Sequence, residues 1–173
     1  PVACAARRRR LPANLGAAVV VVQHMPPGFT AALARRLDSI SPLAVSEAQE
    51  GDAVAVGRVL IAPGGFHLTV GPDHRAHLNE APALHGVRPA ADITLASIAE
   101  VYGKNTTVAV LTGMGKDGAE GAARIERLGG TILVQDEASC VVFGMPKSAR
   151  ELTKNPHEIA LDHMAEALIR AVA

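Results

Sequence analysis

The sequence predicts an α/β protein built on a doubly wound, mostly parallel sheet with helices on both faces. Two observations support this fold class. The run at residues 18–22 (AVVVV) is continuously apolar, which is typical of a strand buried on both faces of a parallel sheet. Strand-like runs then alternate along the chain with segments of helical spacing, the pattern of a doubly wound sheet.

The remaining elements follow from apolar runs bounded by glycine, proline and polar residues. A short strand is expected around Val45, and residues 66–70 can pair back as a hairpin. The other expected strands are residues 58–62, 107–111 and 131–134, and the expected helices without a named cap are residues 119–128 and 147–152. Polar residues are expected to cap three more helices: Thr30 for residues 31–37, Asp92 for 93–102 and Asp162 for 163–172.

Composition favours one domain, residues 1–173, that is large enough to bury a core. The 17 basic residues balance 17 acidic ones, so charge gives no case for binding nucleic acid or a membrane surface. Four consecutive arginines at residues 7–10 are expected to form a solvated helix face. No apolar run reaches membrane-spanning length, and Cys4 and Cys140 are too few for a disulfide framework. We therefore expect a cytoplasmic protein.

The loop after the strand at residues 107–111 is expected to carry function. Gly113, Gly115 and Gly118 form a GxGxxG pattern between a strand and a helix, the setting of a dinucleotide-binding fingerprint. Asp117 argues against this interpretation, because a carboxylate inside the loop would repel a pyrophosphate. The carboxylate can instead orient a catalytic base, or the glycines can serve packing alone. The residues by themselves leave these three interpretations open.

His24 is the second candidate, because it follows the strand at residues 18–22 and precedes a rigid Pro-Pro-Gly turn. A histidine at the carboxyl end of a parallel strand can be catalytic, and the alternative is a structural, hydrogen-bonded histidine. Four further histidines lie close together in sequence but lack the spacing of a known zinc motif, so no metal site is expected there. These are His67, His74, His77 and His85.

Five motifs occur in the order in which one known family carries them: VVVVQHMPPGFT, IAPGGFH, HGVRPAADI, LTGMGKDGAEG and QDEASCVVFGMP. From about residue 11 onward the chain closely resembles the methylesterase domain of the chemotaxis response regulator CheB. The resemblance implies a doubly wound parallel α/β sheet. It also implies hydrolysis of glutamate methyl esters on chemoreceptors, deamidation of certain receptor glutamines, and a Ser-His-Asp triad that needs no cofactor.

In this resemblance His24 corresponds to the catalytic histidine and Asp117 to the aspartate of the triad. Met114 corresponds to a residue that lines the active site near the oxyanion position. The chemistry agrees with the residues, because an imidazole held in one tautomer by a carboxylate can take the proton of a serine hydroxyl.

The nucleophilic serine of the family has no counterpart in the sequence. Its Gly-Ala-Ser-[Thr/Ser]-Gly-Gly turn would fall just upstream of Pro1, and none of the six serines matches that turn. Ser139 and Cys140 are poor substitutes because no small-residue turn flanks them. We therefore expect a chain truncated at its N-terminus that lacks the first, central strand and is inactive as an esterase.

The resemblance also sets the expected partners. These are the cytoplasmic helices of methyl-accepting chemoreceptors and, in the parent protein, a receiver domain of the kind that the family often carries. Neither a cofactor nor a metal, nucleic acid or membrane insertion is expected. A catalytically inactive receptor-docking module is the alternative function, and a dinucleotide-binding domain is the remote one.

Overall fold

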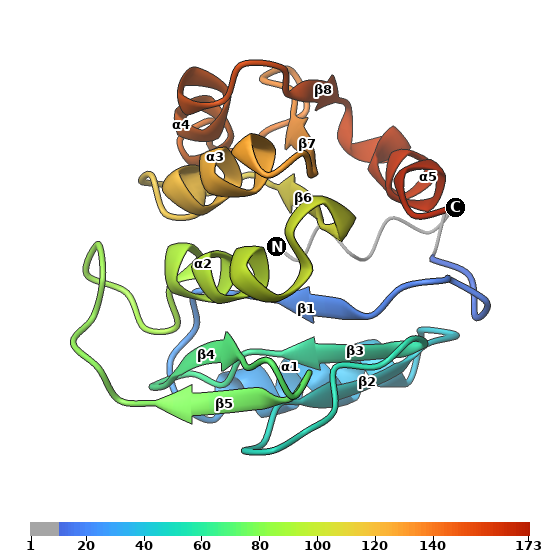
Figure 1. Cartoon of the computed structure of the whole chain (residues 1–173), viewed down its shortest axis with the longest axis vertical. Coiled ribbons are helices and arrows are strands. Elements are labelled where there is room, and N and C mark those ends of the chain that lie inside the picture. The colour runs from blue at the N-terminus through green and yellow to red at the C-terminus, as the bar shows by residue number, and fades with distance from the viewer. Residues whose placement is uncertain (1–10) are drawn as a thin grey trace.

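Two three-stranded parallel sheets lie at the centre of the structure, a computed structural model that describes residues 11–173 (Figure 1). The first sheet has the order β1-β3-β2, the second has the order β6-β7-β8, and β4 and β5 form a separate antiparallel hairpin. The strands are β1 (Val19–Val21), β2 (Ala44–Glu47), β3 (Arg58–Ile61), β4 (His67–Val70), β5 (Ala76–Asn79), β6 (Thr107–Val110), β7 (Thr131–Gln135) and β8 (His157–Ile159). The helices are α1 (Phe29–Asp38), α2 (Ala91–Tyr102), the 3₁₀ helix η2 (Gly103–Asn105), α3 (Ala119–Arg127), α4 (Met145–Leu152) and α5 (Leu161–Ala171).

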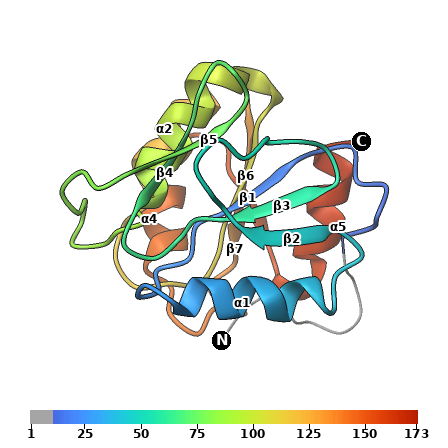
Figure 2. The same ribbon diagram turned by 90° about the horizontal axis from the view of Figure 1, so that it is seen from below.

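The first sheet is covered by α1 on one face and by the β4–β5 hairpin with α2 on the other (Figure 2). Alternation along β3 explains this arrangement, because successive side chains of a strand point to opposite faces. Val59 packs in one core with Leu33 of α1, while Leu60 packs in another with Leu68 of β4. In the register of this sheet, Val20 and Ser46 both pair with Leu60.

The second sheet is also covered on both faces. Val108 and Ile132 share a core with Ile125 of α3 and with residues of α2 and α4. Leu133 points to the opposite face, where it packs with Met164 of α5. Parallel strands with helices on both faces confirm the predicted α/β class. Within residues 11–173, however, β1 and β6 are each paired along one edge only, so the strands form two sheets rather than one.

The three predicted helix caps were wrong, because each helix begins earlier than expected. Gly28, Ala90 and Ala160 occupy the N-cap positions of α1, α2 and α5. Thr30 and Asp92 lie inside the first turns of α1 and α2, where their side-chain oxygens form hydrogen bonds with other parts of the chain. The hydroxyl of Thr30 donates to Glu47 at 2.5 Å. Strand β8 was not predicted, because it is short and polar.

Helices α2 and α3 approach each other closely at Gly121. A Cβ built at this glycine would lie 2.4 Å from the Cβ of Leu95, far inside van der Waals contact. Because Leu95 Cβ is fixed to the backbone of α2, a rotamer change cannot relieve this overlap. The run of arginines at residues 7–10 lies outside the described residues. Among the described helices, none is long and apolar enough to cross a membrane.

Gly121→Ala tests this packing. We expect it to lower the free energy of unfolding by about 1–3 kcal/mol, the usual cost of overpacking, despite the better helix propensity of alanine. Urea unfolding followed by circular dichroism measures the change. Gly16→Ala is the control, since a Cβ there would meet its nearest neighbour, Val172 O, at 3.7 Å. Unchanged stability of Gly121→Ala would contradict the requirement for a glycine.

Candidate active site

His24 and Asp117, the two main candidates from the sequence, meet beyond the carboxyl ends of β1 and β6. Nε2 of His24 lies 2.6 Å from Oδ2 of Asp117, although 93 residues separate them in the chain. The Asp117 side chain is 4% exposed and the His24 side chain is 24% exposed. The carboxylate is therefore withdrawn from water, while the imidazole reaches the surface.

The contact determines which nitrogen of His24 can act as a base. With Nε2 donating its hydrogen to Asp117, the lone pair of a neutral imidazole is on Nδ1. Among the described residues, Nδ1 of His24 has no hydrogen-bond partner. The arrangement can therefore accept a proton at Nδ1 and stabilise the resulting imidazolium through the carboxylate.

The carboxylate of Asp117 also accepts hydrogen bonds from two amides at the start of α2. Its Oδ2 accepts a hydrogen bond from the Ala91 amide at 2.6 Å, and its Oδ1 accepts one from the Asp92 amide at 3.0 Å. Burial by itself raises the pKa of Asp117, but hydrogen bonds from His24 and from the Asp92 and Ala91 amides outweigh it and hold the pKa below its ordinary value. The positive end of the helix dipole acts in the same direction. Asp117 is therefore ionised near neutral pH.

The glycine loop positions Asp117 rather than leaving room for a phosphate. Gly118 has a φ of 89° at the N-cap of α3, a left-handed conformation that lets the chain turn into the helix directly after Asp117. A pyrophosphate would need free amides at the start of this helix. The Gly121 amide is already bonded to Oδ1 of Asp92 at 2.8 Å. Both the buried carboxylate and the occupied amide argue against dinucleotide binding.

Met114 stands at the rim of the same loop with 86% of its surface exposed. The neighbouring Gly113 amide donates to the Val142 carbonyl at 3.1 Å, which joins this loop to the segment after β7. That segment brings two more exposed apolar side chains to the rim, Val141 at 76% and Val142 at 44%. No role was predicted for these two valines, because no local signal in the sequence places them beside Met114.

The two substitute nucleophiles considered from the sequence do not reach His24. The hydroxyl of Ser139 donates to Oδ1 of Asp136 and accepts a hydrogen bond from the Leu161 amide, so it holds a turn to the start of α5. Burial raises the pKa of the Cys140 thiol, which disfavours the reactive thiolate. Among residues 11–173, no hydrogen bond joins His24 to a serine. Cys4 lies outside the described residues.

Within residues 11–173, one group of potential metal ligands includes Asp117 of the pair: the ligand atoms of His85, Asp92 and Asp117 lie within 4.8 Å of one another. Hydrogen bonds already use these atoms. His85 Nε2 lies 2.9 Å from Oδ2 of Asp92, whose other oxygen accepts from Gly121. N–H donors therefore already occupy the oxygens of both buried carboxylates. The other three histidines of the sequence cluster each have separate partners: Pro82 and Ala90 for His67, Tyr102 for His74, and Glu50 with Asp73 for His77.

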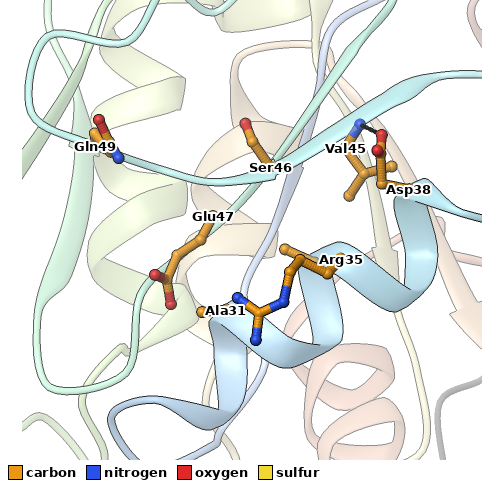
Figure 3. Close-up of a pocket in the computed structure, with 8 residues that line it drawn as sticks. Ala31, Arg35, Asp38, Val45, Ser46, Glu47 and Gln49 are labelled. Atoms are coloured by element: carbon orange, nitrogen blue, oxygen red, sulfur yellow. Dashed lines mark hydrogen bonds between the residues drawn. The ribbon is translucent and has the colours of Figure 1, made fainter.

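A surface pocket of about 290 Å³ lies elsewhere, between α1 and the free edge of β2 (Figure 3). It shares no residue with the His24–Asp117 pair. Asp38 on α1 reaches across to accept a hydrogen bond from the Val45 amide at 2.8 Å, the dashed line in Figure 3. Satisfying an edge amide in this way protects the strand from pairing with another chain.

The lowered pKa of Asp117 predicts how the free energy of unfolding depends on pH. An unfolded aspartate titrates near about 3.9, so the ionised carboxylate stabilises the fold above that pH, and the contribution is lost as the pH falls through the lower folded pKa. Asp117→Asn removes this contribution. We expect the difference in unfolding free energy between the two proteins to be largest near pH 7 and to shrink below about pH 4.

Urea unfolding at a series of pH values measures this difference. Asp162→Asn is the control, since Asp162 is an exposed aspartate in the first turn of α5. A difference for Asp117→Asn that stays constant down to pH 2 would contradict the lowered pKa.

Comparison with known proteins places this chain in a family. Residues 3–168 match the family described as CheB methylesterase. The protein-glutamate methylesterase/protein-glutamine glutaminase of Symbiobacterium thermophilum is 47% identical over 163 residues, and that of Pyrococcus abyssi is 45% identical over 166 residues. Each alignment covers 94% of this chain and 45% of the relative, so the chain spans about half the length of these curated relatives.

A solved structure agrees with the sequence comparison. The crystal structure of the Thermotoga maritima CheB methylesterase catalytic domain matches with a TM-score of 0.85 and 46% identity. The match covers 92% of this chain and 86% of that one. Both the sequence match and the fold confirm the predicted resemblance: the chain belongs to the CheB methylesterase family, a family of hydrolases.

Proposed function

We propose that this chain supplies the base and the orienting carboxylate of a protein-glutamate methylesterase and glutaminase that acts on chemoreceptors. The observation that carries the proposal is the 2.6 Å contact between His24 and the buried, ionised Asp117. Such a pair activates a hydroxyl nucleophile. The activity for which the relatives are named supports the choice of substrate, since these relatives are 47% and 45% identical to the chain.

In the proposed reaction, Nδ1 of His24 removes the proton of a serine hydroxyl as the hydroxyl oxygen attacks the carbonyl carbon of the glutamate ester. The imidazolium then gives that proton to the departing methoxide, and methanol leaves an acyl-enzyme. Water, deprotonated by the same nitrogen, releases the glutamate carboxylate and regenerates the serine. For a glutamine side chain the leaving group is ammonia. Asp117 stays ionised throughout and stabilises each imidazolium.

The nucleophile is proposed to come from outside residues 11–173, since no described serine bonds to His24. The arrangement of the strands supports this. The β1 edge of the first sheet faces the β6 edge of the second, and neither edge is paired (Figure 1). A parallel strand between them would bring its carboxyl end beside the loops that carry His24 and Asp117. A serine in the turn after that strand would complete the triad, and without it the chain is inactive.

A protein substrate fits the surface around the pair. Four large apolar side chains are exposed around the pair. They lie on the loops and the helix start that follow β1, β6 and β7, and such a group is typical of a protein-binding surface. Their exposed fractions are 60% for Phe29, 86% for Met114, 76% for Val141 and 44% for Val142. We propose that receptor helices contact this rim. The proposal includes a cytoplasmic setting and a receiver domain in the parent protein.

Methanol release from a methylated chemoreceptor tests the function. We expect the full-length product of the gene to release methanol and His24→Ala to lower kcat by about 10³- to 10⁴-fold, the usual effect of disabling a triad. His77→Ala is the matched control, because this exposed histidine contacts Glu50 and Asp73 instead. A folded full-length protein that binds receptor but releases no methanol would instead establish the docking module as its function.

A further inference from the structure

A second histidine–aspartate pair lies directly behind the first. Nε2 of His85 is 2.9 Å from Oδ2 of Asp92, whose side chain is 5% exposed. The imidazole of His85 is 18% exposed and extends inward from the loop between β5 and α2. A buried carboxylate is costly unless hydrogen-bond donors surround it, so Asp92 depends on this partner.

Asp92 connects the two pairs through its backbone. Its amide donates to Oδ1 of Asp117, while its carboxylate accepts a hydrogen bond from the Gly121 amide in the first turn of α3. Asp117 belongs to the loop that leads into α3, and Asp92 belongs to the first turn of α2. Each helix start is therefore held by a carboxylate from the start of the other helix. Neither carboxylate can rotate without releasing an amide at a helix start.

His85 lies at the outer end of this hydrogen-bond network. Its φ of 53° lies in the left-handed region, which is uncommon for a residue with a Cβ. Gly86 follows with a φ of 77°, and Leu84 and Val87 form an isolated bridge across the turn. This tight turn presents the imidazole to Asp92. Strain of this kind persists only where the surrounding contacts enforce it.

We propose that Asp92 and His85 are positioning residues of the hydrolase: together they fix the first turn of α2 and, through it, the orientation of Asp117 and of the His24 ring. The chain of contacts runs from His85 to the Asp92 carboxylate, then through the Asp92 amide to Asp117 and on to Nε2 of His24. The kinetic part of this inference rests on the proposed function. The structural part, that the His24–Asp117 hydrogen bond depends on Asp92 and His85, does not.

Proton NMR of the full-length gene product labelled with ¹⁵N-histidine tests the structural part. The Nε2 hydrogen of His24 is expected to be protected from exchange by its bond to Asp117. We expect Asp92→Asn and His85→Ala to speed this exchange by about tenfold or more, as loosening of the acceptor exposes the hydrogen. His85→Gln should restore protection, because the glutamine amide can donate to Asp92.

Two control variants separate positioning from general destabilisation. Asp162→Asn changes an aspartate at the same position of another helix, the second residue of α5, and His77→Ala removes a surface histidine that contacts two carboxylates. Neither should alter the His24 signal. If Asp92→Asn does not fold, the His85→Ala and His85→Gln pair decides the matter. Unchanged His24 exchange in folded His85→Ala would overturn the proposal.

Kinetics then test the catalytic consequence. For misplacement of a catalytic group, we expect His85→Ala to lower kcat about 10- to 100-fold with little change in KM, and His85→Gln to recover most of the loss. A purely structural role would lower the unfolding temperature but leave kcat per folded molecule unchanged. If the unsubstituted protein releases no methanol while the exchange results hold, the proposed function fails and the structural dependence stands.

Discussion

The hydrogen bonds of one buried carboxylate, Asp117, organise the part of the molecule where the two sheets and the starts of α2 and α3 meet. The carboxylate accepts from the imidazole of His24 and from two amides at the start of α2. These donors come from the loop after β1 and from the start of α2, two segments that are far apart in the chain. A charge in this environment costs several kcal/mol unless it is fully bonded. The surrounding elements must therefore keep their positions for the carboxylate to remain ionised.

The same constraint explains the close approach of α2 and α3. Asp92 can reach the Gly121 amide only if the two helix starts lie together, and Gly121 permits this because it has no Cβ to meet Leu95. Small residues at a helix crossing thus have an electrostatic consequence as well as a packing one. The result is a His24 imidazole whose orientation is fixed by the packing of the two helix starts around Asp117.

The organisation of the sheets determines where the His24–Asp117 pair lies. Each three-stranded sheet has its own hydrophobic core, with helices or the hairpin on both faces. His24 is carried by the first sheet and Asp117 by the second, so their contact joins the two halves of the molecule at the carboxyl edge of the strands. Exposed apolar residues on neighbouring loops, among them Met114, surround this junction. Both halves therefore contribute to the surface at this edge.

The sequence by itself determined the fold class, the position of most strands and helices, and the two residues that form the pair. Buried strands and amphipathic helices have strong periodic signals, and motifs at strand ends are local features of the chain. Tertiary structure alone decided the hydrogen bonds of Asp92 and His85 and the position of Val141 and Val142 beside Met114. Asp92 was expected to cap its own helix, but its oxygens bond to another helix and to a distant loop. Such contacts depend on how elements pack in space, which local propensity does not encode.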